Sequence, residues 1–195
     1  YGSDLKDSID LIQVIEHILA IPELPRLRLS SIWPTDVTDD LIRLMQQHAP
    51  RFCRYLHLAV QHGDNEILRS MKRTYTIEET SSLLEKLTKK VPDICIGADI
   101  MVGFPGETDE DFADSLHFCE KMQYTQMHVF RYSPRDGTPA ASYPDQIPGD
   151  VAAARSQAMI AVGMKTGRAF RESMIGRRMN VLVERTTDEN GLLAG

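Results

Sequence analysis

The chain has 195 residues, of which 42% are hydrophobic and 26% are charged, a composition that fits a globular domain and excludes disordered and collagen-like classes. Acidic residues outnumber basic ones by 28 to 22, giving a formal net charge of −6, so any nucleic-acid contact requires a local basic patch. No apolar run approaches the roughly 18 residues that span a bilayer, and the N-terminus lacks a secretion signal, so we expect a cytoplasmic protein with no membrane partner.

The first part of the chain predicts a helix, a strand and a second helix. Residues 4–20 carry apolar side chains at helical spacing until two prolines end the pattern. Residues 26–32 alternate polar and apolar side chains, which indicates a strand that ends before Pro34. Helical spacing returns over residues 36–48, with aspartates at the positive N-terminal end of the predicted helix.

Three further strands alternate with helices. We predict strands over residues 55–60, 94–102 and 126–132, and helices over residues 76–90 and 108–122. The strand starts are separated by roughly 30 to 40 residues, which is the size of a strand–helix–parallel strand unit. The predicted fold class is therefore α/β, with a parallel sheet or partial barrel that binds its ligand at the carboxyl ends of the strands.

The last part of the chain has a different organisation. The prolines of residues 133–149 predict a linker, which a long helix follows over about residues 150–174. A strand over residues 179–184 and a turn over residues 188–191 come next. Because the chain starts at Tyr1 and not at Met, we expect a piece of a longer protein. The predicted units are a sheet domain (1–148), a linking helix (149–175) and the start of a small β-domain (176–195).

The loops after the predicted strands carry unusual residues. Residues 103–106 place two glycines between a strand and a capped helix, which would let the backbone approach a flat ligand. A tight turn is the alternative, and spacing alone favours it because no complete phosphate-binding fingerprint is present. Gln61, His62 and Gly63 offer an amide, an imidazole and bare backbone after the second strand, although a hydrogen-bonded histidine is commoner than a catalytic one.

Asp99 lies inside the apolar third strand, where an ionised carboxylate has to be paired or hydrogen-bonded. A role in a site and a purely structural pair are about equally compatible with this position. Arg28, in the first predicted strand, is the expected partner in the second case.

Two other groups of residues bear on metal and RNA binding. Cys53, Cys95 and Cys119 are far apart in the sequence, which predicts no metal or iron–sulfur site in this chain. Between Lys165 and Arg185, six basic residues stand against two acidic ones, so a patch that contacts phosphates could form there. A solvated helix face explains the same charges equally well.

Four stretches resemble the radical S-adenosylmethionine methylthiotransferases, namely RLRLSSIWPTDVTDDLI, HLAVQHGDNEILRSMKRTY, DIMVGFPGETDEDF and HVFRYSPRDGTPAA. The resemblance covers residues 26–141 and implies the C-terminal part, about four strands, of a partial (β/α)6 barrel, followed by the start of a TRAM-like β-domain. The SSI and YSPRDGTPAA stretches look most like the branch that methylthiolates threonylcarbamoyladenosine beside the transfer RNA anticodon. The isopentenyladenosine and ribosomal-protein branches are the alternatives within the family. His62 and Ala59 depart from the family's usual Ser and Pro.

The resemblance implies that the full-length enzyme uses S-adenosylmethionine and two 4Fe–4S clusters to place sulfur on C2 of the adenine. Its partner would be the anticodon stem-loop of transfer RNA, with an unidentified electron donor. The family's cluster cysteines precede this part of the barrel, so we expect no catalytic residue here and no activity from the chain alone. The implied S-adenosylmethionine-binding residues are Ser30, Ser31, Gln61, Gly63, Asp99, Val102, Gly103, Phe104 and Pro105. The implied RNA-binding residues are Arg168, Arg171, Arg177 and Arg178.

A different class of function is also compatible with these patterns, namely a domain that binds a nucleotide or RNA without redox chemistry. A three-cysteine loop upstream of Tyr1 in the longer protein would decide for the enzyme. We also expect the strand over residues 26–32 to be an unprotected sheet edge, through which two copies of the chain could associate.

Overall fold

The computed structural model describes residues 9–179, 182–183 and 191. Within this part of the chain the strands are β1 (Ser31–Ile32), β2 (Tyr55–Gln61), β3 (Cys95–Val102) and β4 (Gln126–Arg131). The α-helices are α1 (Leu11–Leu19), α2 (Asp39–Gln47), α3 (Asn65–Ser70), α4 (Ile77–Lys90), α5 (Asp109–Met122) and α6 (Gly149–Ser173). Short 3₁₀ helices over Pro34–Asp36 and Pro139–Ser142 lie in the connections.

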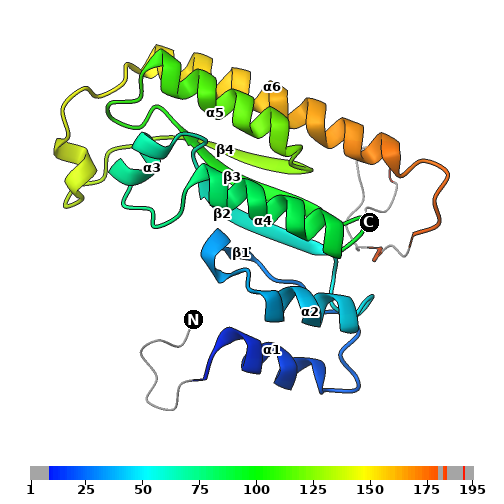
Figure 1. Ribbon diagram of the computed structural model, residues 1–195. Helices are drawn as coiled ribbons and strands as arrows, with labels where there is room; N and C mark the ends of the chain where they lie inside the picture. The colour runs from blue at the N-terminus through cyan, green and yellow to red at the C-terminus, as the bar shows by residue number, and fades with distance from the viewer. Residues whose placement is uncertain (1–8, 180–181, 184–190, 192–195) are drawn as a thin grey trace.

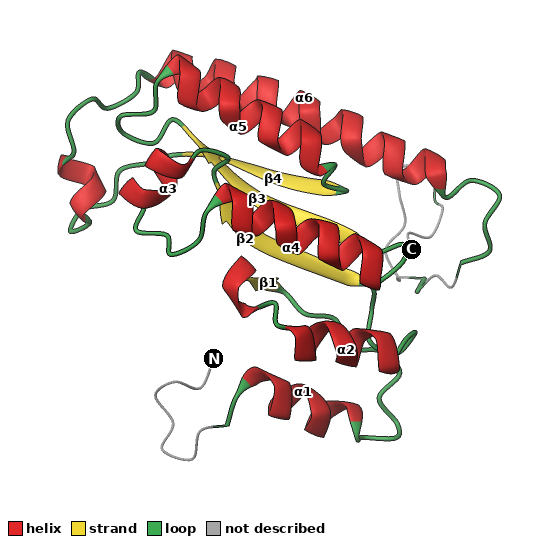
Figure 2. Cartoon of the chain, in the orientation of Figure 1, coloured by secondary structure: helices red, strands yellow, loops and turns green. Residues whose placement is uncertain are grey.

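The strands form one parallel sheet in the order β1-β2-β3-β4. Helices line one side of this sheet (Figure 1; Figure 2), and each of the longer helices contacts its neighbour: α1 with α2, α2 with α4, α4 with α5 and α5 with α6. A parallel sheet whose helices follow the strand order on one side is a segment of a barrel wall. The predicted α/β class and partial barrel are therefore confirmed.

The core lies between the sheet and the helices. Alternate side chains of β2 and β3 face the helices and are at most 5% exposed, namely Leu56, Leu58, Val60, Ile96, Ala98, Ile100 and Val102. Burying one large aliphatic side chain stabilises the fold by about 1.5–3 kcal/mol, so this alternation holds both strands in register. The side chains between them point to the opposite face, which none of the helices in the described part of the chain covers.

Side chains cap the first turns of α1 to α5. Thr76 and Glu79 form a capping box at α4, and Thr108 and Asp111 form one at α5, which agrees with the predicted helices over residues 76–90 and 108–122. Asp10 caps α1, so α1 begins at Leu11. The predicted helix began at residue 4, and that prediction is wrong for residues 9–10, which precede the helix. Residues 1–8 of the prediction lie outside the described residues.

The predicted strand over residues 26–32 is wrong for most of its length. Only Ser31 and Ile32 pair as a strand with β2, and Leu27 adds one isolated bridge to Phe52. The backbone of Leu27 bonds to Arg51 and Cys53, which lie before β2 begins. An extended segment between prolines produces the same alternation as a strand whether or not its backbone is paired, so the pattern could not separate the two.

Other differences are local. The predicted loop after Gln61 contains α3, a six-residue helix that Asp64 caps. The predicted linker over residues 133–149 contains the 3₁₀ helix Pro139–Ser142. Most of the predicted strand over residues 179–184 and turn over residues 188–191 lies outside the described residues. The predicted domain boundaries stay predictions.

The two edges of the sheet differ in length. β1 offers two residues and β4 offers six, so a second chain that adds through backbone hydrogen bonds has the longer template at β4. Self-association through the 26–32 segment stays a prediction. Among the described helices, none combines the length and apolar character needed to cross a membrane.

Candidate functional site

The uncovered face of the sheet carries polar side chains on neighbouring strands. Tyr55 and His57 come from β2, Asp99 from β3, and Gln126 and His128 from β4. In a closed barrel the face opposite the helices lines the interior, whereas the sites of enzymes with such a fold lie at the carboxyl ends of the strands. A pocket of about 390 Å³ lies on this face, and its lining residues are Arg28, Leu29, Ser30, Ser31, Tyr55, His57, Asp99 and His128.

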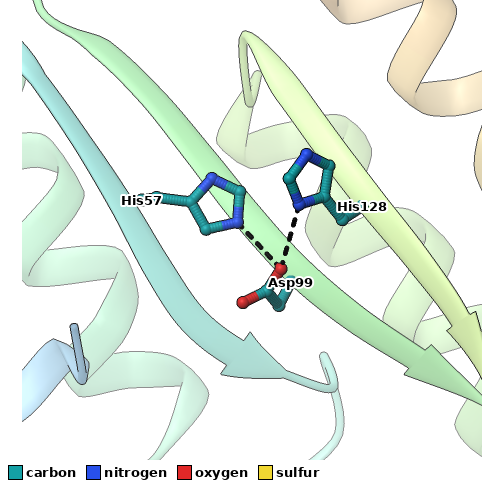
Figure 3. A group of neighbouring side chains, drawn as sticks. All are labelled: His57, Asp99 and His128. Atoms are coloured by element: carbon teal, nitrogen blue, oxygen red, sulfur yellow. Dashed lines mark hydrogen bonds and ion pairs between the residues drawn. The ribbon is translucent and has the colours of Figure 1, made fainter. Parts of the chain in front are cut away.

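Asp99 is the centre of this polar group (Figure 3). Its Oδ1 lies 2.8 Å from His57 Nε2 and 3.3 Å from His128 Nδ1, and its Oδ2 accepts a hydrogen bond of 3.1 Å from Ser31 Oγ. The expected pair with Arg28 is wrong, because the Arg28 guanidinium lies over the Tyr55 ring at 3.8 Å from its centroid. The carboxylate is thus held by groups from three strands and not by a guanidinium.

His57 is fixed from both sides. Its Nδ1 lies 3.0 Å from Tyr55 Oη, and the imidazole ring lies 4.6 Å, centroid to centroid, from that of His128. A Cβ on Gly97, the neighbouring residue in β3, would overlap the His57 ring, so this glycine makes room for the imidazole. The sequence analysis missed His57 and His128. Their only signal was a polar residue at an alternate position of a strand, which becomes specific only once the strand order is known.

A second, more apolar pocket of about 230 Å³ lies beside the carboxyl ends of β2 and β3. Gln61 and Phe104 both line it, as does Tyr132, whose ring meets Phe104 edge-on at 5.3 Å. Gln61 has a φ of +69°, which turns the chain sharply at the end of β2. The structure thus brings Gln61 and Phe104 together, and separately brings together Ser30, Ser31 and Asp99.

The remaining predicted cofactor-binding residues are buried, and the two glycines among them pack against helices. An added Cβ on Gly63 would lie 2.7 Å from Ser115 Cα in α5, and one on Gly103 would lie 2.8 Å from Ala152 Cβ in α6. Val102 belongs to the core, and Pro105 is buried. Close packing against α5 and α6 therefore accounts for the lack of a side chain at Gly63 and Gly103. A cofactor contact through their backbone stays a prediction.

Buried charged groups hold the turn after β3, and the sequence analysis did not foresee them. The Glu107 carboxylate is fully buried and accepts a hydrogen bond from Gly103 N. His62 Nε2 and Arg155 Nη1 each lie 3.5 Å from this carboxylate, and Arg155 Nη2 lies 2.6 Å from Asp109 Oδ1. Loops after two strands are thereby tied to α6.

The predicted RNA-binding arginines are only partly free. Arg168 pairs with Glu172 at 2.7 Å, and Arg177 pairs with Asp93 at 2.7 Å. Arg171 and Arg178 are exposed and form no ion pair among the described residues. At the amino ends of β2 and β3, a hollow of about 920 Å³ gathers five arginines, Arg26, Arg51, Arg54, Arg177 and Arg178. The basic patch is therefore larger than the sequence showed, because three members come from elsewhere.

The cysteines are poor candidates for a cluster. Among the described residues, none of the three belongs to a group of side chains that could hold a metal ion, whereas an iron–sulfur cluster needs several thiolates together. Burial also raises the pKa of the Cys119 thiol to about 12 and raises the pKa of Cys95. We expect anaerobic treatment with iron and sulfide to give no stoichiometric four-iron cluster in this chain. Iron quantification and electron paramagnetic resonance measure this, and four irons per chain with a cluster signal would contradict it.

The chain is similar in sequence to a known protein family and to several curated proteins. The radical SAM superfamily matches residues 2–119. The tRNA-2-methylthio-N(6)-dimethylallyladenosine synthase of Caldicellulosiruptor saccharolyticus is 38% identical over 195 residues, which cover 100% of this chain and 41% of the relative. The enzyme of that name from Rickettsia bellii is 42% identical over 186 residues, 95% of this chain and 42% of the relative. The chain thus spans about two fifths of the length of these relatives.

Solved structures agree on the fold alone. Coproporphyrinogen III oxidase from Escherichia coli aligns with a TM-score of 0.60 at 20% identity, covering 73% of this chain and 32% of that one. A radical S-adenosylmethionine methyltransferase from Kitasatospora setae aligns with a TM-score of 0.54 at 22% identity, covering 67% of this chain and 26% of that one.

Proposed function

Because the chain belongs to the radical S-adenosylmethionine superfamily, we propose that it is the C-terminal part of the barrel of a transfer RNA methylthiotransferase. The observation that carries the proposal is the agreement of relatives 37–42% identical over nearly the whole chain, all of which bear a methylthiotransferase name. The polar pocket on the barrel-interior face of the sheet supports the same conclusion.

The relatives favour a different branch from the one that the sequence motifs suggested. Their name refers to dimethylallyladenosine, which is the isopentenyladenosine of the alternative considered above. We therefore take dimethylallyladenosine of transfer RNA as the substrate of the full-length protein, in place of threonylcarbamoyladenosine.

The residues present fit S-adenosylmethionine but not an iron–sulfur cluster. Asp99, Ser30 and Ser31 could receive the ammonium and hydroxyl groups of the cofactor, and the aromatic wall at Phe104 and Tyr132 suits a flat adenine. Among the described residues, the cysteines belong to no group of side chains that could hold iron. In radical enzymes the cofactor supplies the one-electron chemistry. The residues of this chain would bind and orient the cofactor and the nucleoside and would exclude water from them.

The proposal is tested with the full-length protein in a bacterium that lacks its own transfer RNA methylthiotransferases. Nucleosides from digested transfer RNA are then analysed by mass spectrometry. We expect the 2-methylthio derivative of dimethylallyladenosine. Appearance of the threonylcarbamoyl derivative instead would overturn the choice of branch, and appearance of neither would overturn the proposed activity.

The arginine patch supplies a separate expectation about RNA. Neutralising Arg177 and Arg178 together in the full-length protein should lower the slope of log affinity against log salt by up to about 2, since each lost phosphate contact removes roughly one released counterion. Because Arg177 already pairs with Asp93, most of the change should come from Arg178. Filter binding across a salt series measures the slope. The matched control is Arg43→Gln on α2, and an equal slope in both proteins would show that the patch is a solvated face.

A further inference from the structure

We propose that His57, Asp99 and His128 bind a divalent metal ion of the Zn²⁺ type on the uncovered face of the sheet. One ligand atom from each residue lies within 4.8 Å of the other two. The three residues come from β2, β3 and β4, and the site uses no cysteine. Cysteine spacing therefore gave no sign of it, and the proposal departs from the sequence-based expectation of no metal site in this chain. Asp99 and its pocket are also assigned above to S-adenosylmethionine, so the ion and the cofactor's ammonium group would compete for this carboxylate. The proposal concerns the chain without cofactor, and its test does not depend on the proposed function.

The distances suit a tetrahedral ion after small side-chain rotations. Zinc bonds to nitrogen and oxygen of about 2.0–2.2 Å place two ligand atoms of a tetrahedral ion roughly 3.3–3.5 Å apart. In this structure Asp99 Oδ1 lies 2.8 Å from His57 Nε2 and 3.3 Å from His128 Nδ1 (Figure 3). Figure 3 shows both imidazoles turned toward the same carboxylate oxygen. The ion would replace the direct contacts between Asp99 Oδ1 and the two rings.

Each ligand also has a second partner that fixes its orientation. His57 Nδ1 lies 3.0 Å from Tyr55 Oη, so a proton on Nδ1 leaves the Nε2 lone pair for the ion. Asp99 Oδ2 accepts from Ser31 Oγ, which leaves Oδ1 toward the two rings. His128 Nε2 lies 3.1 Å from the side-chain amide of Gln126, which can turn its oxygen toward the ring. Outer partners of this kind are typical of metal-binding histidines and carboxylates.

The charge and shape of the pocket agree with an ion that keeps an open position. Arg28, the only Lys or Arg among the pocket-lining residues, is held on the Tyr55 ring and leaves the Asp99 charge uncompensated by a cation. Two imidazoles and one carboxylate are a donor set that suits Zn²⁺ and Fe²⁺ and disfavours Mg²⁺ and Ca²⁺. The pocket of about 390 Å³ beside the three residues leaves room for a water or a ligand oxygen as the remaining ligand.

The test titrates Zn²⁺ into the reduced, chelator-treated chain by isothermal calorimetry and records the visible spectrum with Co²⁺ as a probe. We expect one ion per chain, a cobalt spectrum without thiolate charge-transfer bands, and a rise in melting temperature on adding Zn²⁺. His128→Ala should weaken binding at least about 100-fold, since even loss of an outer partner weakens metal binding by about 10–100-fold. Asp99→Asn should act in the same direction.

The matched control is His117→Ala, an exposed histidine on α5 at the other side of the sheet, which should leave the affinity unchanged. His128 is about half exposed, so its substitution should leave the fold intact, as circular dichroism checks, and it decides the question even if Asp99→Asn fails to fold. Absence of stoichiometric binding, equal affinity in His128→Ala, or thiolate bands that place the ion on the cysteines would each overturn the proposal.

Discussion

Replacing Glu107 with alanine should lower the free energy of unfolding by about 3–5 kcal/mol, the usual effect of removing one partner of a buried ion pair. The substitution leaves Arg155, which is 7% exposed, without its buried carboxylate neighbour, and leaves Gly103 N without an acceptor. The exposed Asp109 keeps its bond to Arg155, but a solvent-screened partner cannot replace a buried one. The Gly103 turn and α6 should loosen together, because the carboxylate joins them.

Urea denaturation measures this loss, and a thermal scan should show a decrease in melting temperature of about 6–20 °C for a chain of this size. The matched control is Glu110→Ala, an exposed glutamate in the first turn of α5, for which we expect a loss below about 1 kcal/mol. Glu107→Gln keeps an acceptor for Gly103 N and removes the charge, so a loss smaller than that of alanine would assign the difference to the hydrogen bond. Equal small losses in Glu107→Ala and Glu110→Ala would contradict the expected role of the cluster.

Features that depend on neighbouring residues could be predicted from the sequence. The capping boxes of α4 and α5 join residues three positions apart, so the sequence pattern alone specifies the contact. The near-continuous apolar run of β3 likewise indicated a central strand, since both of its neighbours and its helix layer need apolar or small partners. Fold class follows from such local features taken in order.

The candidate site needed information that the sequence does not hold. Asp99 was recognisable as a carboxylate in need of a partner, but its partners come from β2 and β4, and the register that places His128 beside Asp99 is a property of the sheet. Nothing in the sequence singled out Glu107, whose carboxylate lies 3.5 Å from Nη1 of Arg155, 48 residues later in α6. Contacts between strands and between distant helices therefore account for what the sequence analysis missed.

The second large effect is expected at Gly103, for two separable reasons. Its φ is +73°, a conformation that costs a residue with a side chain about 1–2 kcal/mol, and more if the side chain is β-branched. A Cβ added at Gly103 would lie 2.8 Å from Ala152 Cβ in α6. Overpacking of this kind in a well-packed core costs a further ~1–3 kcal/mol. Gly103→Val should therefore destabilise the fold itself, by about 3–5 kcal/mol, because the added bulk points at a helix.

Gly106 separates the two reasons, because it has a φ of +85° but nothing within 4 Å of an added Cβ. Gly106→Ala should show only the backbone cost of about 1–2 kcal/mol, and Gly103→Ala that cost plus the clash. Combining Gly103→Ala with Ala152→Gly should remove the clash and restore the stability lost to it, less the roughly 1 kcal/mol that a glycine costs inside a helix. Equal losses from Gly103→Ala and Gly106→Ala in urea denaturation would show that α6 does not press on the turn. If Gly103→Ala then lowered S-adenosylmethionine affinity in the full-length protein while Gly106→Ala did not, the backbone of the turn would remain assigned to the cofactor.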